Sequence, residues 1–448
     1  MEAQDEIIDL MQEMVRNKCV NPPGNEMKSI RTIERFLNGY GVKPEVFQSA
    51  PQRGNLYAEI RGGDGPSFML GPAHVDVVPV EDEERWVVPP FSGEVHDGFI
   101  WGRGTFDMLF IVACQVVAFA RLHNDEFEPN GTLKLLIVSD EETHGLKGAR
   151  WMIRHHPDKV KTDYLVTELG GFPVAQDRYA IQYGEKGDCW LRITAHGREQ
   201  HGSMPFGSDN AVTKLVRIIE RLGKYRPEVC TDYVTLLVEK MPISGLTKWL
   251  LSKKKVMPYI LNHLAESDPA QAKLLHAISR MTISPNVIHG GTKTNVVPGR
   301  AYVDVDIRTL PNQTTKAVMT DLKKHLGDLS EGADIELMPI PGYEPIRGNE
   351  SSLESPLVSA IVSVLKKLLG EKAQLVPLFS PGQTDSRFFR KEFGTDAYGF
   401  SLFDDRMSGG DLIAMPHSDN ERVSLGTLDL TYQAYREITE LVLGKEHN

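Results

Sequence analysis

The stretch Ala73-His74-Val75-Asp76-Val77-Val78-Pro79 places a histidine and an aspartate shortly after the apolar run SFMLG (67–71). Such a run is typical of a strand that is buried on both faces of a sheet. A later stretch, GRGTFDM (102–108), adds Asp107. Open α/β sheets bind their ligands at the carboxyl ends of their strands. The first stretch therefore predicts an α/β fold with a functional site at the edge where this strand ends.

The chain beyond this stretch alternates between the patterns of helices and strands. Helices are predicted at 110–122 and 146–155, and strands at 132–139 and 164–167. Glu141 follows one of these strands and Glu168 follows the other, as His74 follows the first. Such alternation predicts a catalytic domain with a mixed, mostly parallel sheet flanked by helices.

The character of the sequence changes near Gly187. From there to about residue 346 the predicted elements follow a β-α-β-β-α-β-like order, which is typical of a ferredoxin-like α+β domain. We therefore predict an inserted domain at 187–346 and a catalytic domain made of 1–186 and 347–448. Within the insertion, residues 230–285 have an irregular pattern. Their run Lys253-Lys254-Lys255 is more typical of a solvated face than of a contact patch.

Composition narrows the functional classes. A chain of 448 residues exceeds one typical core, which favours two domains. The formal net charge of −11 argues against nucleic acid or an anionic membrane as the main partner. The four cysteines form no Cys-x-x-Cys pair, which fits a reducing compartment. No signal-peptide pattern begins the sequence and no apolar run approaches the ~20 residues that span a bilayer, so we expect a cytoplasmic protein.

The acidic and imidazole side chains of these segments match the needs of a two-metal hydrolase. Such a site uses Asp, Glu and His ligands, a bridging carboxylate, and a free carboxylate that takes a proton from water. The candidate set is His74 with Glu168 for one metal, Glu142 with His417 for the other, Asp107 between them, Glu141 as base, and Asp76 as partner of the His74 imidazole. Each residue alone has an ordinary explanation, such as a solvated turn for Glu141-Glu142. Their combination favours the metal site.

Six segments carry a resemblance to a known enzyme family. They are AHVDVVP (73–79), WVVPPFSGEVHDGFIWGRGTFDM (86–108), SDEETHG (139–145), TELGG (167–171), TKTNVVPGRAYVDVDIRTLP (292–311) and PHSDNERV (416–423). In this combination the chain resembles the di-zinc metallopeptidase family of aminoacylase, glutamate carboxypeptidase, acetylornithine deacetylase and succinyl-diaminopimelate desuccinylase. The similarity covers most of the chain and is weak at 230–285.

The resemblance implies a role for each matching residue of the metal site. It makes five residues the ligands of two divalent metal ions per chain, with zinc first and manganese or cobalt as alternatives. These ligands are His74, Asp107, Glu142, Glu168 and His417, with Asp107 bridging. It makes Glu141 the catalytic base and Asp76 the carboxylate that orients His74.

The resemblance also implies residues that contact the substrate. His201 matches a histidine that polarises the scissile carbonyl, in its own chain or across a dimer interface. Asn295 and Arg308 match substrate contacts, and a guanidinium suits a free carboxylate. Gly382 matches a loop that lines the pocket. Residues 187–346 would then form a lid domain through which a homodimer assembles.

Two departures from the family pattern bear on specificity. Leu109 stands where the family usually has lysine, and Ala73 where it usually has glycine. Neither position is a ligand, so the chemistry is expected to survive. Leu109 removes a cation near the site, which leaves the preferred substrate open.

The leading functional hypothesis is hydrolysis of the amide bond of N-acyl amino acids or C-terminal peptides. The alternatives are a metal-dependent dipeptidase, a deacylase or deaminase of a small metabolite, and, more remotely, a non-catalytic binding protein that retains the fold. A bulkier or more apolar substrate would suit the long insertion. Its apolar side chains Trp249, Leu250, Leu251 and Tyr259 either line a pocket for such a substrate or serve packing alone.

Overall fold

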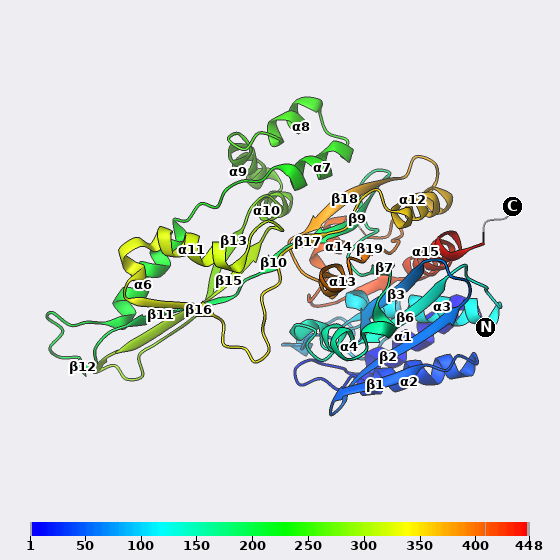
Figure 1. Cartoon of the computed structure of the whole chain (residues 1–448), viewed down its shortest axis with the longest axis horizontal. Coiled ribbons are helices and arrows are strands. Elements are labelled where there is room, and N and C mark those ends of the chain that lie inside the picture. Colours follow the sequence, from blue (N-terminus) through cyan, green and yellow to red (C-terminus); the bar gives the residue numbers. More distant parts are fainter. Residues whose placement is uncertain (1, 408, 446–448) are drawn as a thin grey trace.

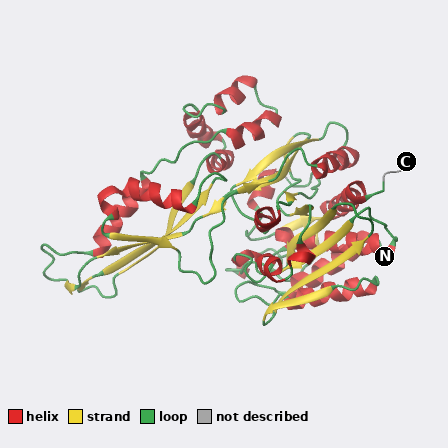
Figure 2. Ribbon diagram, in the orientation of Figure 1, coloured by secondary structure: helices red, strands yellow, loops and turns green. Residues whose placement is uncertain are grey.

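A ten-stranded mixed sheet dominates the computed structural model, which describes residues 2–407 and 409–445 (Figures 1 and 2). The strand order is β1-β2-β6-β3-β7-β19-β9-β17, with β18 and β8 also paired to β9. The strands are β1 (Glu45–Ala50), β2 (Arg53–Arg61), β3 (Ser67–His74), β6 (Thr132–Val138), β7 (Tyr164–Thr167), β8 (Pro173–Ala175), β9 (Arg178–Glu185), β17 (Asn349–Glu350), β18 (Gln374–Ser380) and β19 (Asp396–Gly399). The central strands β6, β3, β7 and β19 run parallel, as an α/β fold requires.

Helices cover both faces of this sheet, because its central strands are apolar on both sides. Leu133, Leu135 and Ile137 of β6 enter one core cluster, whereas Leu136 and Val138 enter a second on the opposite face. This alternation is the period of two of an extended strand. The helices are α1 (Ala3–Asn17), α2 (Met27–Gly39), α3 (Phe110–Asn124), α4 (Ala149–His155), α5 (Pro157–Val160), α12 (Pro356–Leu369), α13 (Ser386–Phe393), α14 (Gly409–Ala414) and α15 (Leu425–Leu443).

Helix α3 is apolar on all sides because it lies inside the core. The segment Thr105–Asn124 is the one described helix that is long and apolar enough to cross a membrane, and most of it is buried inside the protein. It packs against α1 and α15 and against the strands β3 and β6. A helix that is apolar all round belongs to a core or a membrane, and the packing here identifies a core helix.

A second, smaller sheet has a core of its own and extends away from the first (Figure 1). Its strands are β10 (Gly187–Asp188), β11 (Leu191–His196), β13 (Thr282–Gly290), β15 (Arg300–Thr309) and β16 (Ala333–Leu337). Its other elements are α6 (Ala211–Gly223), α11 (Thr315–Leu326), the turn Gly327–Ser330, and the strand pair β12 (Gln200–His201) and β14 (Val296–Val297). The sheet matches the predicted α+β insertion in kind, while the domain limits 187 and 346 stay a prediction.

The segment predicted to be irregular, 230–285, consists mostly of helices. They are α7 (Asp232–Lys240), α8 (Gly245–Leu251), α9 (Met257–Ser267) and α10 (Pro269–Ile278). A proline lies in the first turn of α9 and of α10, where a missing N–H costs nothing. These helices share the core of the large sheet, and the Tyr233 ring stacks on Phe379 of β18 with 4.0 Å between centroids.

Candidate metal centre and active site

The carboxyl ends of three adjacent central strands supply three of the predicted ligands. His74 ends β3, Glu142 lies in the helical turn Glu141–Thr143 after β6, and Glu168 follows β7 directly. Asp107 comes from the segment Thr105–Leu109 that leads into α3, and its own backbone is extended rather than helical, with φ −116° and ψ 97°. His417 comes from the loop before β20 (Arg422–Ser424), and β20 pairs with β5 (Phe99–Trp101), next to β4 (Val95–His96). This small sheet brings the His417 loop beside the Asp107 turn.

Asp107 lies between the two histidines and offers one oxygen to each. Its Oδ1 is 3.3 Å from His74 Nε2, and its Oδ2 is 3.3 Å from His417 Nε2. Glu168 Oε2 lies 3.8 Å from His74 Nε2 on one side. Glu142 Oε2 lies 3.2 Å from His417 Nε2 on the other. The structure thus brings all five predicted ligands together, with the carboxylate expected to bridge at the centre.

Several atoms of this cluster are buried and face one another without a hydrogen bond. They include His74 Nε2, Asp107 Oδ1 and Glu142 Oε1. A buried polar atom without a partner is costly, and a bound cation would satisfy all three at once. Potential ligand atoms form two groups that share His74, and within each group all of the atoms lie within 4.8 Å of one another. One group is His74, Asp107 and Glu142, and the other is His74, Glu141 and Glu168. The donor set of imidazole and carboxylate fits zinc.

Charge within the cluster shifts the pKa of its members strongly. Burial alone would raise the pKa of Asp107, but its contacts with His417 and His74 hold that pKa far below the usual range. Contacts with Asp107 and Glu142 raise the pKa of His417 to about 10. Burial raises the pKa of Glu168 to about 8. Without metal His417 therefore carries a proton at neutral pH, and a metal ion would have to displace it.

Glu141 lies beside the cluster and is the carboxylate best placed to exchange protons. Its pKa is raised well above the usual range, chiefly by burial and then by the nearby charge of Glu168. A general base needs a raised pKa and a position within reach of the reacting atoms. Glu141 has the raised pKa and lies next to His74 and Glu168, which is the position expected for the predicted base.

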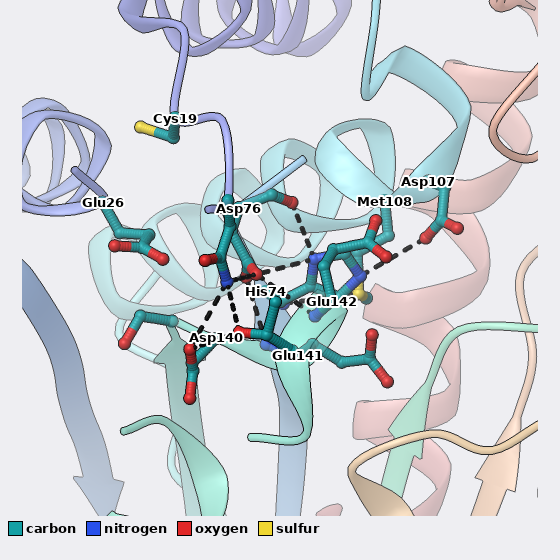
Figure 3. A network of polar contacts seen from close by, with 12 residues as sticks. Cys19, Glu26, His74, Asp76, Asp107, Met108, Asp140, Glu141 and Glu142 are labelled. Carbon is teal, nitrogen blue, oxygen red and sulfur yellow. Dashed lines mark hydrogen bonds and ion pairs between the residues drawn. The ribbon is translucent and has the colours of Figure 1, made fainter. Parts of the chain in front are cut away.

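Asp76 connects His74 to the turn that carries both glutamates (Figure 3). Its two carboxylate oxygens accept the backbone N–H groups of Glu141 at 3.2 Å and of Glu142 at 3.1 Å. His74 Nδ1 lies 3.0 Å from the main-chain oxygen of Asp76 and 3.6 Å from its carboxylate. The residue therefore orients the imidazole mainly through its carbonyl and holds the glutamate turn with its carboxylate.

A buried polar network supports this arrangement from behind and was not anticipated from sequence. Asn21 donates to Asp76 Oδ2 at 2.9 Å and to Thr143 Oγ1 at 2.9 Å. Arg53 pairs with Asp140 at 2.6 Å and with Glu26 at 2.7 Å, and all three side chains are almost fully buried. The signal for Asn21 in the sequence was weak, since it reads as part of an ordinary Asn-Pro-Pro-Gly turn.

Glu421 and Arg103 form a buried clamp that joins the loop of His417 to the turn of Asp107. Glu421 accepts the backbone N–H groups of Gly104, Phe106 and Asp107 at 2.8–2.9 Å. Arg103 pairs with Glu421 at 2.9 Å and donates to the carbonyl oxygens of His417 and Ser418. Gly104 has φ +83°, and a Cβ there would meet Val77 at 2.2 Å, so this turn requires glycine. The clamp thereby fixes Asp107 relative to His417.

Replacement of Glu421 by glutamine is expected to lower metal affinity about 10- to 100-fold while the protein stays folded, because residues behind metal ligands typically have effects of this size. An amide in place of the carboxylate brings a donor against backbone N–H groups. Metal retained after dialysis against a series of chelator concentrations measures the effect. The exposed Glu81→Gln is the matched control, and equal metal retention by both variants would contradict the clamp.

The residues predicted to contact substrate fall into two places. Arg308 lies between the smaller sheet and the loop after β18, where it pairs with Asp306 at 2.8 Å and reaches Gln383 at 3.4 Å, beside Gly382. His201 ends β12 and Asn295 directly precedes β14, its partner strand, at the far end of the smaller sheet from the predicted metal ligands (Figure 1). Both are exposed, and within one chain the structure does not bring them to the cluster.

Two further positions clarify the site. Leu109 is fully buried and belongs to the main core cluster. At the position where the family usually has lysine, this chain therefore has an apolar side chain that packs in the core. Asp385, which the sequence did not single out, is a buried carboxylate whose two oxygens have no hydrogen-bond partner. Burial raises its pKa to about 7, against the lowering effect of Arg387. The sequence feature that could have pointed to Asp385 is its position three residues after Gly382, in the loop predicted to line the pocket.

A cluster of histidines and carboxylates at the carboxyl ends of central α/β strands defines a metal-dependent hydrolase. The model of peptidase family M20/M25/M40 matches residues 72–441, and the chain belongs to this family. It is accordingly a metal-dependent enzyme that hydrolyses amide bonds.

Relatives and solved structures agree with this assignment. A protein of Staphylococcus aureus (strain Mu50 / ATCC 700699) named probable succinyl-diaminopimelate desuccinylase is 24% identical over 388 residues, covering 86% of this chain and 88% of that protein. The M20 metallo-carboxypeptidase Sso-CP2 of Sulfolobus solfataricus has the same fold, with a TM-score of 0.75, 20% identity and 99% coverage of both chains. Human carnosine dipeptidase 1 shares the fold with a TM-score of 0.68, 16% identity, and coverage of 98% of this chain and 96% of that one.

Proposed function

We propose that the enzyme hydrolyses the amide bond of N-acyl amino acids or of C-terminal peptide residues at a site with two divalent metal ions. The observation that carries the proposal is the position of Asp107, with one oxygen toward His74 and the other toward His417, both at 3.3 Å. Glu168 would complete the first metal position and Glu142 the second. Zinc suits these donors best, and manganese and cobalt accept them too.

The chain supplies the proton transfer and the positioning. Bound metal ions would act as Lewis acids and make a water molecule more acidic. Glu141 would take the proton of this water and return it to the leaving nitrogen. Asp76 would keep His74 oriented and hold the turn that carries Glu141 in register with it.

Arg308 is the candidate for recognising a free carboxylate. Asp306 engages its guanidinium with two contacts and also accepts the indole N–H of Trp190, which fixes both side chains. The remaining edge faces Gln383, next to Gly382. A guanidinium held in this way can still bind a carboxylate with that edge, because its donors form a planar fork.

Substrate class can be tested with a panel of N-acyl amino acids, free dipeptides and N-acyl amino acid methyl esters. We expect N-acyl amino acids to have a higher kcat/KM than free dipeptides. Blocking the carboxylate should lower kcat/KM about 10- to 100-fold, which is the typical value of a charged hydrogen bond. Faster cleavage of free dipeptides would instead favour a dipeptidase, the class named for two neighbours in fold.

The smaller sheet is proposed to act as a lid and dimerisation domain at 187–346. His201 and Asn295 are exposed at its far end, so a second protomer is the simplest route by which they could reach a metal centre. Strand β13 lies at an edge of this sheet among the described residues, with Val287 and Ile288 exposed. An exposed apolar edge strand favours pairing with another chain.

The proposed location is the cytoplasm. All four cysteines are free thiols, three of them buried. Unpaired buried thiols are typical of proteins in a reducing compartment.

A further inference from the structure

One segment of the protein has a charge opposite to that of the whole. Residues 240–265 contain five lysines and no Asp or Glu, in a chain with a formal net charge of −11. The lysines are Lys240, Lys248, Lys253, Lys254 and Lys255. The net acidity that argues against an anionic partner for the whole molecule therefore does not hold locally.

The same segment exposes large apolar and aromatic side chains. Leu246 is 68% exposed, Trp249 55% and Tyr259 74%, and Ile243 is also exposed. Other residues of these helices, such as Leu251, are buried in the core. The exposed side chains are therefore not needed for the packing of this segment. Trp249 and Tyr259 are too exposed to serve packing alone.

Most of the lysines and apolar side chains lie on one short segment, made of α8, the turn after it and the start of α9. Leu246 and Trp249 are three residues apart and share one side of α8, and Lys253 lies in the turn that follows the end of the helix at Leu251. Lys253 Nζ lies 5.0 Å from the centre of the Trp249 ring. Figure 1 places α8 at the outer end of the α7–α10 cluster, away from both sheets. The basic aromatic face is defined here as Ile243, Leu246, Trp249, Lys253, Lys254, Lys255 and Tyr259.

We propose that the basic aromatic face docks the enzyme onto an anionic lipid membrane. Trp and Tyr are the side chains enriched at membrane–water interfaces, and lysines are attracted to anionic headgroups. Helices that lie flat in the membrane–water interface typically combine leucine and tryptophan on one face with lysine on the other. Helix α8 has seven residues, far fewer than the ~20 that span a bilayer, so the contact is peripheral. The positive charge of the face complements the negative surface of such a membrane.

The helices that carry the docking face pack against the catalytic core, since Leu251 and Met257 belong to its core cluster. Tyr233 of α7 stacks on Phe379 of β18, which precedes the loop of Gly382. Lys186, at the start of the smaller sheet, donates to the carbonyl oxygens of Ala277 and Arg280 at 3.0 and 2.9 Å. Membrane docking would therefore bring the catalytic core close to the lipid surface. The proposal does not depend on the substrate class.

Cosedimentation of the full-length enzyme with lipid vesicles tests the proposal. One set of vesicles contains phosphatidylcholine alone, and the other contains phosphatidylcholine with phosphatidylserine. We expect binding to the second set only, with loss of binding at high salt. The triple variant Lys253→Gln, Lys254→Gln, Lys255→Gln should bind about a hundredfold more weakly, from roughly fivefold per lysine. Vesicles should also shift the tryptophan emission to the blue in the wild type but not in Trp249→Phe.

The matched control carries the same change of charge elsewhere. Lys316, Lys323 and Lys324 are exposed on α11, and their replacement by glutamine should leave vesicle binding unchanged. All variants should hydrolyse soluble substrates at the wild-type rate, which confirms that they fold. Equal loss of binding in both triple variants would overturn the proposal. Failure of the wild type to bind anionic vesicles would also overturn it. If polyglutamate binds the face and anionic vesicles do not, the partner is an acidic polypeptide and not a membrane.

Discussion

Replacement of Glu141 by glutamine is expected to lower kcat at least about 10³-fold, within the range that general acid–base groups contribute. Glutamine keeps the size of the side chain but cannot take a proton from water. The structure leaves the Glu141 carboxylate next to the His74–Glu168 side of the cluster, where burial raises its pKa. Steady-state kinetics with metal-loaded protein measure the effect, and KM should change little because Glu141 is not a predicted substrate contact.

The neighbouring glutamate separates the two proposed roles. Glu142→Gln should lose metal, since Glu142 Oε2 lies 3.2 Å from His417 Nε2. Glu141→Gln should keep the wild-type metal content. Near-wild-type turnover by metal-loaded Glu141→Gln would show that another group accepts the proton.

Replacement of His201 by alanine is expected to lower kcat about 10²- to 10³-fold, the typical cost of removing a donor to a developing oxyanion. The residue lies on β12, far from the metal ligands of its own chain (Figure 1). The effect is therefore expected to come from the partner protomer. Mixing His201→Ala with Glu141→Ala protomers should restore part of the activity, because one of the two sites then has both residues intact.

Exchange of protomers must be verified in the mixing experiment, for example with two affinity tags. Recovery of activity after exchange is the expected result. A mixture that exchanges but stays inactive would place His201 in its own site or outside the reaction. A matched control is His263→Ala, an exposed histidine on α9 and away from β13, which should keep wild-type kcat.

The ligand cluster could be predicted from sequence because its residues follow recognisable strands. His74, Glu142 and Glu168 come after apolar runs that form β3, β6 and β7, and parallel strands end at the same edge. Asp107 and His417 do not follow these strands; they joined the candidate set because their side chains complete the needs of a two-metal site, and the family resemblance then implied a role for each. The α/β class followed from the same alternation of helices and strands.

The supporting contacts could not be predicted because they join segments that are distant in sequence. Arg103 and Glu421 are 318 residues apart, and neither residue alone carries a pattern. The helices α7–α10 were missed for another reason. They are 7 to 11 residues long, too short for a clear helical pattern in the sequence, and α9 and α10 each have a proline in the first turn. The position of His201 relative to the metal ligands depends on the arrangement of the two sheets, which periodicity does not encode.

Calorimetric titration of the metal-depleted enzyme with zinc tests the central claim most directly. We expect two ions per chain for the wild type and fewer for Asp107→Asn, since Asp107 faces both His74 and His417. Binding should release protons at neutral pH and tighten as the pH rises, because His417, with a pKa raised to about 10, must lose its proton to bind metal. One ion or none per wild-type chain, or equal binding by Asp107→Asn, would contradict the two-metal centre.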